Sequence, residues 1–505
     1  MTTTPAPDGA SAAASPRPTS LAAPVGGSPA KQADPDRVPF GKNLAWNARG
    51  LSMAANVLIL GYFSLYATDT LGMTPALLGT LMLFSKLFDG VTDLVAGWLI
   101  DRTHTRWGRA RPYEFAMLGM WLSTWLLFST PDMSTAGKAV WIFILYTLVN
   151  SVFATLANVN QTLYTALAFP TRVAMGKVAA FGGVLISFGA ILIAIVVPIG
   201  LDWAGKDASR WSTFILGFSL VFLILGMMRF LFVKEIVTQA ADTTEKVTFR
   251  EIFAMLRDNK YIWMLLIVAL LSAIASNTGA AAYYYRYIVG NLSMQSVTAG
   301  IAVIVVPTVA LVPWLMKKFR LTRIIFVGQL LIIVAAGINF AANGNIIPLV
   351  IATLVSGLGT LPGTYMIGIL LIDCSTYNEW RGHRRLESIM GSVHSFAGKL
   401  GAGIAGWIAG LILSSAGYDG SLEVQAAPAN MAITVLFAIL PGVAALFTAI
   451  IYWFFDLDQR LPQINVDLAA RRGETAGNGT DSDDAVGQAA AATESEGSLG
   501  SLREP

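Results

Sequence analysis

The chain has 505 residues, of which 55% are hydrophobic and only 13% are charged. A soluble globule of this length needs more polar surface than this composition supplies, so the composition excludes the soluble class and predicts a polytopic membrane protein. The formal net charge of +3 says little about function by itself. Cys374 is the single cysteine, which excludes an intrachain disulfide, and we expect it to be a small buried apolar side chain.

Apolar stretches long enough to cross a bilayer of about 30 Å recur along the whole chain. They lie near residues 44–68, 75–100, 113–131, 139–165, 177–200, 211–233, 261–288, 296–316, 322–342, 347–373, 388–416 and 428–455. We expect each stretch to form one transmembrane helix, giving twelve helices.

Composition also divides the chain into halves and tails. Small and polar residues dominate 1–37 and 458–505, so we expect both tails to be disordered, and the first tail lacks the pattern of a secretory signal. The connection 234–260 separates an N-terminal half, 38–233, from a C-terminal half, 261–457. Within it, Thr248 and Glu251 form a capping box that predicts a helix along the inner membrane surface. An extension of the seventh helix is an equally open interpretation.

Lys and Arg gather in alternate connections, those after the second, fourth, eighth and tenth predicted helices. They are Arg102, Arg106, Arg109 and Arg111, then Arg172 and Lys177, then Lys317, Lys318, Arg320 and Arg323, and then Arg381, Arg384 and Arg385. Because cytoplasmic loops are enriched in basic residues, this pattern predicts that both termini are cytoplasmic. We expect a multi-pass protein of the plasma (cytoplasmic) membrane, the inner membrane of a cell that has two.

Asp89 and Asp93 lie four residues apart within the second apolar stretch. Each ionised Asp near the bilayer centre costs roughly 2.5–3.5 kcal/mol, and this spacing places the two carboxylates about 6 Å apart on one helix face. The pair therefore predicts a cation-binding site. The alternative is a buried carboxylate cluster that protons or basic side chains neutralise without transport.

Three segments carry the most specific motifs. They are YATDTLGMTPALLGTL from Tyr66, FDGVTDLVAGWLIDRTHTRWGRARP from Phe88, and IDCSTYNEWRGHRRLESIMGSVHSFAGKLG from Ile372. They closely resemble the corresponding segments of the glycoside-pentoside-hexuronide:cation symporters, the family of the melibiose permease. The resemblance covers roughly residues 45–455 and implies an all-α membrane protein with the major facilitator fold, twelve transmembrane helices in two six-helix halves. It implies a carrier and not an enzyme.

The resemblance assigns a cation site. It implies that Asp89 and Asp93 bind the coupling Na⁺ or H⁺, that Thr92 and Thr155 supply further oxygens, and that Lys399 balances charge across the halves. Oxygen ligands suit a small monovalent cation because they replace its lost hydration shell. Hydroxyls bonded back to their own helix, and a purely structural Lys399, are the alternatives. No cofactor beyond the coupling ion is expected.

The solute site is less well defined, because the two acidic solute-binding positions of the melibiose permease correspond here to Met53 and Asn158. The remaining polar candidates are Asn56, Asn158, Asn160, Tyr365, His394 and Ser395. Hydroxyl recognition needs such donors and acceptors. Interhelical hydrogen bonds, or packing in the case of Tyr365, would explain the same residues without a solute.

Charged residues at the predicted cytoplasmic edge suggest a gate. Ion pairs among Asp101, Arg102, Arg109, Glu379, Arg385 and Glu387 would latch that edge in an outward-facing state, and topology signalling alone is the alternative. Arg49 would reach toward the cytoplasm. The run from Tyr283 to Tyr287 is interpreted as an interfacial aromatic belt rather than a solute gate.

The sequence therefore predicts a secondary active symporter that imports a glycoside, oligosaccharide or related polar solute with Na⁺ or H⁺ by alternating access. Its partners would be the solute and membrane lipid, with no nucleic acid, and the transport unit would be a monomer. A carrier of the same fold with a lipid-like solute and a non-transporting membrane sensor are the alternatives.

Overall fold

A computed structural model describes residues 36–103, 105–236 and 255–471, and for a few residues within helices, Asp93, Asp101 and Arg102 among them, it describes the backbone alone. These residues are helical apart from their connections and one isolated bridge between Thr105 and Gly108. The predicted capping-box residues Thr248 and Glu251 lie outside the described residues, and helix is recorded at 255–258, directly before the seventh span.

The helices of the N-terminal half are α1 (Phe40–Leu60), α2 (Phe63–Leu65), η1 (Tyr66–Thr70), α3 (Pro75–Arg102), η2 (Arg111–Phe115), α4 (Ala116–Leu127), α5 (Thr135–Thr147), η3 (Leu148–Phe153), α6 (Ala154–Ala168), α7 (Arg172–Ala204) and α8 (Ala208–Phe232). Side-chain caps fix several starts. Thr171 accepts a hydrogen bond from the amide of Ala174 at α7, and Asp207 accepts from two amides at α8.

The helices of the C-terminal half are α10 (Lys260–Ser276), α11 (Ala280–Tyr283), η4 (Tyr284–Ile288), α12 (Met294–Ile301), η5 (Ala302–Leu311), α13 (Val312–Lys318), α14 (Leu321–Ala341), α15 (Ile346–Trp380), α16 (Glu387–Ser415), α17 (Ala427–Thr434), η6 (Val435–Ile439), α18 (Leu440–Phe454) and α19 (Leu457–Arg471). The segments η1, η3, η4 and η6 are π-helical turns that join their neighbours into longer helices.

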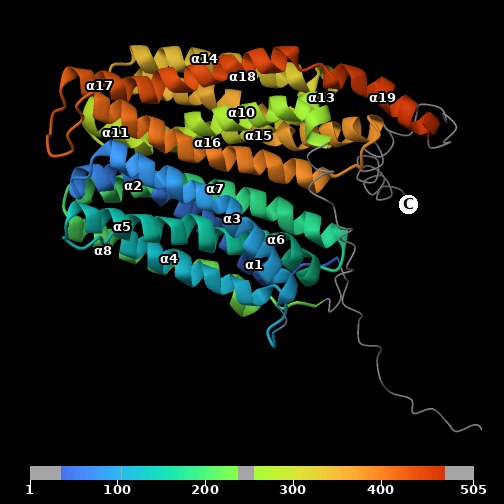
Figure 1. Cartoon of the computed structure of the whole chain (residues 1–505), viewed down its shortest axis with the longest axis horizontal. Helices are drawn as coiled ribbons and strands as arrows, with labels where there is room; N and C mark the ends of the chain where they lie inside the picture. The colour runs from blue at the N-terminus through green and yellow to red at the C-terminus, as the bar shows by residue number, and fades with distance from the viewer. Residues whose placement is uncertain (1–35, 104, 237–254, 472–505) are drawn as a thin grey trace, which may run out of the picture.

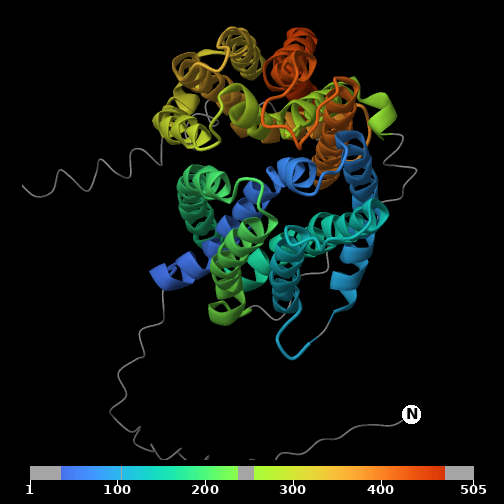
Figure 2. The same ribbon diagram turned by 90° about the vertical axis from the view of Figure 1, so that its left-hand side faces the viewer.

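Helices stand at all twelve predicted spans. Among the described residues, nine helical stretches are long and apolar enough to cross a membrane, and ten if the bent pair Met294–Thr308 and Val312–Lys318 counts as one. The two other predicted positions hold α3 and the stretch formed by η2 and α4. Figures 1 and 2 show the two halves packed side by side, and in Figure 1 their helices diverge toward the end that holds α19 and the start of α1.

Glycines bring α3 and α16 together at the opposite end of the molecule. A Cβ atom at Gly79 would lie 2.5 Å from the carbonyl oxygen of Gly406, and one at Gly410 would lie 2.3 Å from that of Pro75. No larger residue fits where two backbones approach this closely. We call this end, where the halves touch, the closed end, and the other the terminal end.

The last helix corrects the predicted C-terminal boundary. The sequence predicts a disordered tail from residue 458, but Leu457–Arg471 form α19. Its apolar face buries Ile464 and Leu468, and the indole nitrogen of Trp380 donates to Asp467 (3.0 Å). A helix that packs through a single apolar stripe is otherwise polar, so its composition resembles that of a disordered tail. This resemblance explains why the sequence placed the start of the tail too early.

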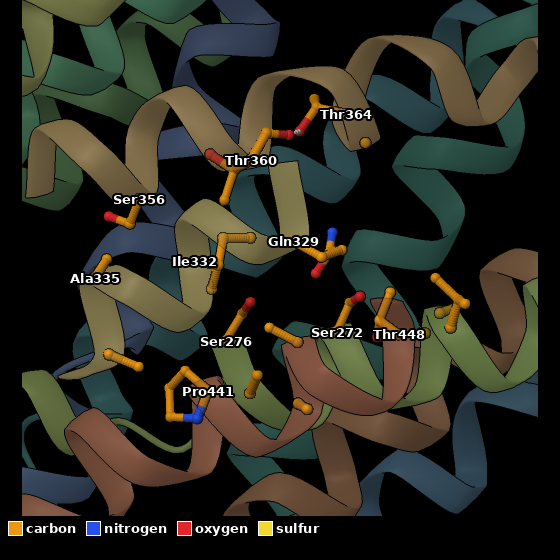
Figure 3. A pocket seen from close by; sticks show the side chains of 18 of the residues that line it. Ser272, Ser276, Gln329, Ile332, Ala335, Ser356, Thr360, Thr364, Pro441 and Thr448 are labelled. Atoms are coloured by element: carbon orange, nitrogen blue, oxygen red, sulfur yellow. Dashed lines mark hydrogen bonds between the residues drawn. The ribbon is translucent and has the colours of Figure 1, made fainter. Parts of the chain in front are cut away.

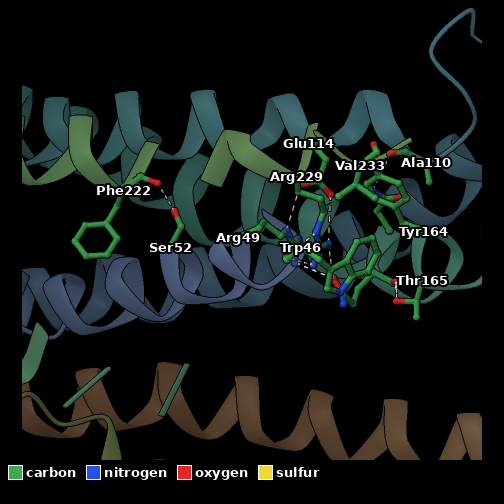
Figure 4. A network of polar contacts seen from close by, with 12 residues as sticks. Trp46, Arg49, Ser52, Ala110, Glu114, Tyr164, Thr165, Phe222, Arg229 and Val233 are labelled. Atoms are coloured by element: carbon green, nitrogen blue, oxygen red, sulfur yellow. Dashed lines mark hydrogen bonds and ion pairs between the residues drawn. The ribbon is translucent and has the colours of Figure 1, made fainter. Parts of the chain in front are cut away.

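A buried ion cluster holds the terminal end of the N-terminal half together (Figure 4). Glu114 of η2 pairs with Arg49 of α1 (3.5 Å) and with Arg229 of α8 (3.6 Å), and all three residues are at most 4% exposed. The amide oxygen of Gln161 accepts from both guanidinium groups, at 3.1 and 2.6 Å. Arg229 also lies 3.8 Å above the ring of Trp46.

This cluster corrects the expectation for Arg49, which does not reach toward water. Its guanidinium group stays inside the half because it pairs with the buried carboxylate of Glu114, which it shares with Arg229. The cluster therefore ties α1, η2, α6 and α8 into one unit.

We predict that Glu114→Gln destabilises the protein by about 3–5 kcal/mol, because it leaves both arginines without their carboxylate. Thermal unfolding of the purified protein in detergent measures this loss. The matched control is Asp207→Asn, which removes a pair with Arg210 in which both side chains are about half exposed. That pair contributes about 1 kcal/mol or less. Equal unfolding midpoints for the two variants would contradict the prediction.

Candidate functional site

A cavity of about 620 Å³ lies between the two halves, beside the closed end. Six of its polar or titratable lining residues come from both halves: Asn56, Lys86, Tyr146, Asn150, Asn277 and Gln295. Met53, at one of the positions where the melibiose permease has an acidic residue, also lines it. We call it the central cavity.

Lys86 lines this cavity and forms an ion pair with Asp89, which is buried behind it and does not line the cavity. The ammonium nitrogen of Lys86 lies 3.7 Å from Oδ2 of Asp89, and the side chains are 15% and 3% exposed. The two residues are three apart on α3, so they share a helix face. The other carboxylate oxygen of Asp89 is buried and accepts no hydrogen bond from the described residues. It remains available to a cation or a proton.

The π-helical turn η3 orients a third member of the site. Asn150 lies in this turn, donates its amide to the carbonyl of Tyr146 (3.2 Å), and so presents its oxygen to the ammonium of Lys86 (3.1 Å). The hydroxyl of Ser151 donates to the carbonyl of Ser85 (3.0 Å), which fixes η3 against α3 next to Lys86. A π turn at a functional site is common because it re-aims side chains within a helix.

The other residues of the predicted cation site have different surroundings. The hydroxyl of Thr92 donates to carbonyls of its own helix, at Phe88 and Asp89 (both 3.1 Å). Thr155 is buried, and Lys399 lies close enough to Lys86 for their charges to interact. The side chain of Asp93 lies outside the described part of the chain. No group of three or more His, Cys, Asp or Glu residues suited to a metal occurs among the described residues.

Sequence reasoning missed Lys86 and Asn150. The signal for Lys86 was present, because a lysine stands inside an apolar stretch three residues before Asp89. Asn150 had no such signal, since an Asn in a membrane helix more often bonds to its own or a neighbouring helix.

The predicted solute residues of the N-terminal half do not gather in one place. Asn56 lines the central cavity and donates its amide to the hydroxyl of Thr124 (2.8 Å). Asn160 is buried and donates to the carbonyl of Ala110 (2.8 Å), in the connection between α3 and η2. Asn158 is exposed and does not line the central cavity.

The predicted solute residues of the C-terminal half do not line the central cavity. His394 and Ser395 line a second cavity, which lies within that half. Tyr365 is 51% exposed and lines neither cavity. The structure thus brings Asn56 to the central cavity and His394 and Ser395 to another one.

Tyrosines close the molecule at the closed end. Asp69 of η1 accepts hydrogen bonds from the hydroxyl of Tyr287 in η4 (2.6 Å) and from that of Tyr418, so a carboxylate of one half is held by two phenols of the other. Beside it, the hydroxyls of Thr68 and Tyr283 lie 3.1 Å apart. We call Thr68, Asp69, Tyr283, Tyr287 and Tyr418 the tyrosine latch.

Further polar contacts surround the latch. Lys206 donates to the carbonyls of Gly420 (2.8 Å) and Leu422 (3.0 Å), and Arg286 pairs with Asp202 (3.7 Å). The aromatic-belt interpretation of residues 283–287 was therefore wrong, because Tyr283, Tyr284 and Tyr285 are at most 3% exposed. They lie inside the protein rather than at a membrane surface.

The predicted gate residues lie at the terminal end. Arg385 pairs with Glu387 (2.8 Å) and Glu379 (3.9 Å), all within the C-terminal half. The backbone amide of Arg109 donates to Glu235 (3.0 Å) in the N-terminal half. The side chains of Asp101 and Arg102 lie outside the described part. A latch between the halves in an outward-facing state stays a prediction.

Comparison with known proteins gives the family. Residues 50–459 match the family model described as MFS/sugar transport protein. The isoprimeverose transporter of Lactiplantibacillus pentosus is 27% identical over 88% of this chain and 95% of its own length. A putative glycoside/cation symporter of Escherichia coli (strain K12) is 27% identical over 86% of this chain and 95% of its own.

A solved structure shares the fold. A bacterial homologue of the human lysosomal transporter Spinster superposes with a TM-score of 0.59 at 13% identity, over 84% of this chain and 96% of that one. The helices of the described residues therefore have the major facilitator fold. Since the family model spans most of the sequence, the chain belongs to the MFS/sugar transport protein family.

Proposed function

We propose that this protein is a secondary active symporter that imports a glycoside, an oligosaccharide or a related polar solute with Na⁺ or H⁺. The observation that carries the proposal is the pairing of Lys86, which lines a polar cavity between the two halves, with the buried carboxylate of Asp89. Amide and hydroxyl groups on the wall of this cavity match the hydroxyls of a sugar. A lipid-like solute would instead favour an apolar wall.

The distribution of basic residues supports an orientation. Lys and Arg are frequent in the connections at the terminal end, so both termini face the cytoplasm and the closed end faces outward. The tyrosine latch is then the outer gate of an inward-facing state.

The coupling cation binds at Asp89, with Asp93, Thr92 and Thr155 as further candidate ligands. In the cation-free carrier, Lys86 balances the buried carboxylate of Asp89. A bound Na⁺ or proton takes over this role and releases the ammonium toward Asn150 and the cavity. Solute and cation then raise each other's affinity by the same factor.

Uptake into vesicles tests the function. The carrier is reconstituted, and isoprimeverose and a panel of other glycosides are supplied under a Na⁺ gradient or a proton gradient, each imposed separately. We expect one gradient to drive accumulation of at least one solute. Accumulation of none under either gradient would contradict the proposal.

We predict that Asp89→Asn and Asp93→Asn each abolish gradient-driven accumulation, since an amide cannot exchange a proton or balance Na⁺. The internal solute then only equilibrates with the external solute. Asp132→Asn, whose parent side chain is fully exposed, is the control and retains accumulation. Accumulation at the unmodified level in both site variants would contradict the assignment.

Lys86→Met gives a different expected phenotype. Without the ammonium, the cation-free carrier carries an unbalanced buried charge at Asp89, so its return step is slow. Solute exchange, which needs only the loaded carrier, persists while net accumulation falls. Counterflow of labelled solute measures exchange. Lys138→Met is the control, because this lysine lines neither cavity and its ammonium donates to the carbonyl of Leu71 (3.3 Å). Equal loss of exchange and accumulation would contradict a counter-ion role.

The tyrosine latch predicts a shift in conformation. Asp69→Asn removes the charge that receives the two phenol hydrogen bonds, so the closed end opens more often. In a Cys374→Ala background, a cysteine at Ser64, on the wall of the central cavity, reports this opening by faster reaction with an impermeant maleimide added outside. Asp132→Asn serves as control, and unchanged labelling would argue against the latch.

A further inference from the structure

A second cavity of about 660 Å³ lies inside the C-terminal half (Figure 3). Residues of α10, α14, α15, α16, η6 and α18 form its wall, and none of the residues that line it belongs to the N-terminal half. The central cavity, by contrast, is lined by residues of both halves. We call the second cavity the inner cavity.

Neutral polar groups line much of the inner cavity. They are Ser272, Ser276, Gln329, Asn339, Ser356, Thr360, Thr364, His394, Ser395 and Thr448. Figure 3 shows several of them pointing toward one another from different helices. Among the residues that line it there is no Asp, Glu, Lys or Arg, whereas Lys86 lines the central cavity.

Much of this hydrogen-bonding capacity is unused. The hydroxyls of Thr360 and Thr364 donate to carbonyls of their own helix, at 3.0 and 3.1 Å, so each oxygen still accepts from a ligand. The side chains of Ser272, Gln329 and Thr448 have no hydrogen-bond partner among the described residues, although polar groups within a membrane half normally find one.

Solvation of these groups requires a ligand or water. A polar group without a partner in an apolar medium costs several kcal/mol, so this many would not be left dry. Each water takes about 30 Å³ of liquid volume, and the cavity exceeds that many times over. Ile332, Phe437 and Pro441 add apolar surface to the wall. Hydroxyl partners combined with apolar faces are what a sugar ring offers.

We propose that the inner cavity is a second solute site, which binds a neutral polyhydroxylated solute of the glycoside class. This inference rests on the proposed function. The two cavities adjoin, because Ala275, Ser276, Phe437 and Pro441 line both. An anionic sugar is excluded from the inner cavity, since no cation on its wall would balance the charge.

Binding stoichiometry tests the inference. The purified full-length carrier is dialysed to equilibrium against radiolabelled isoprimeverose, a neutral disaccharide, at concentrations well above half-saturation. We expect two molecules bound per chain in the unmodified protein. The double variant Gln329→Leu/Thr448→Val removes an amide and a hydroxyl from the inner wall alone and is expected to bind one.

The matched control is Thr353→Val/Thr434→Val. Both hydroxyls bond their own helices (2.8 and 2.9 Å) and line neither cavity, so this variant should still bind two. Retention of one bound sugar by the inner-wall variant shows that it is folded. If the inner-wall variant binds no sugar, it is replaced by Gln329→Leu alone, which removes only the amide. That single variant is also expected to bind one sugar molecule per chain.

Three results would overturn the inference: one molecule bound per unmodified chain, two retained in the inner-wall variant and its single-substitution version, or no isoprimeverose bound at all. The proposed function is judged separately by gradient-driven uptake of the solute panel. Coupled uptake together with one isoprimeverose molecule bound per chain would reject the second site and would still support the symporter function.

Discussion

A carboxylate buried within a membrane span must have a positive partner, and the Lys86–Asp89 pair meets this requirement on one helix face. Much of the central site follows from this pair. Asn150 turns its oxygen toward the ammonium, and Ser151 fixes η3 against α3 beside it. On the proposed mechanism, the oxygen of Asp89 that has no hydrogen-bond partner is the point where the cation binds.

The four π-helical turns of the described chain each place a residue in the tyrosine latch or on the wall of the central cavity. Asp69 lies in η1, Asn150 in η3, Tyr287 in η4 and Phe437 in η6. An extra residue in a turn rotates the side chains that follow relative to those that precede. A straight α-helix would present different faces to the latch and to the cavities. The π turns therefore let one helix cross the membrane and still direct these side chains toward the latch or the cavities.

The sequence predicted the spans well, because hydropathy over some twenty residues depends on the bilayer and not on packing. It also selected Asp89, since a charge in an apolar stretch is conspicuous. Sequence reasoning was less successful for residues whose role depends on which neighbouring helix they contact. The run 283–287 has the composition of a membrane belt, but Tyr283 and Tyr287 bond to Thr68 and Asp69 of the other half. Asn160, an apparent solute contact, donates to the carbonyl of Ala110 instead. Which face of a helix meets which neighbour is not encoded in local composition.

Charge accounting links the central site to the closed end. On the proposed mechanism, the empty carrier crosses with Lys86 and Asp89 neutralising each other, and the loaded carrier crosses with one further positive charge. A membrane potential that is negative inside therefore favours the inward step by about 2.3 kcal/mol per 100 mV. Both the pair and the Gly79–Gly406 contact lie on α3. The same helix thus carries the charge that changes on binding and the surface on which the halves close.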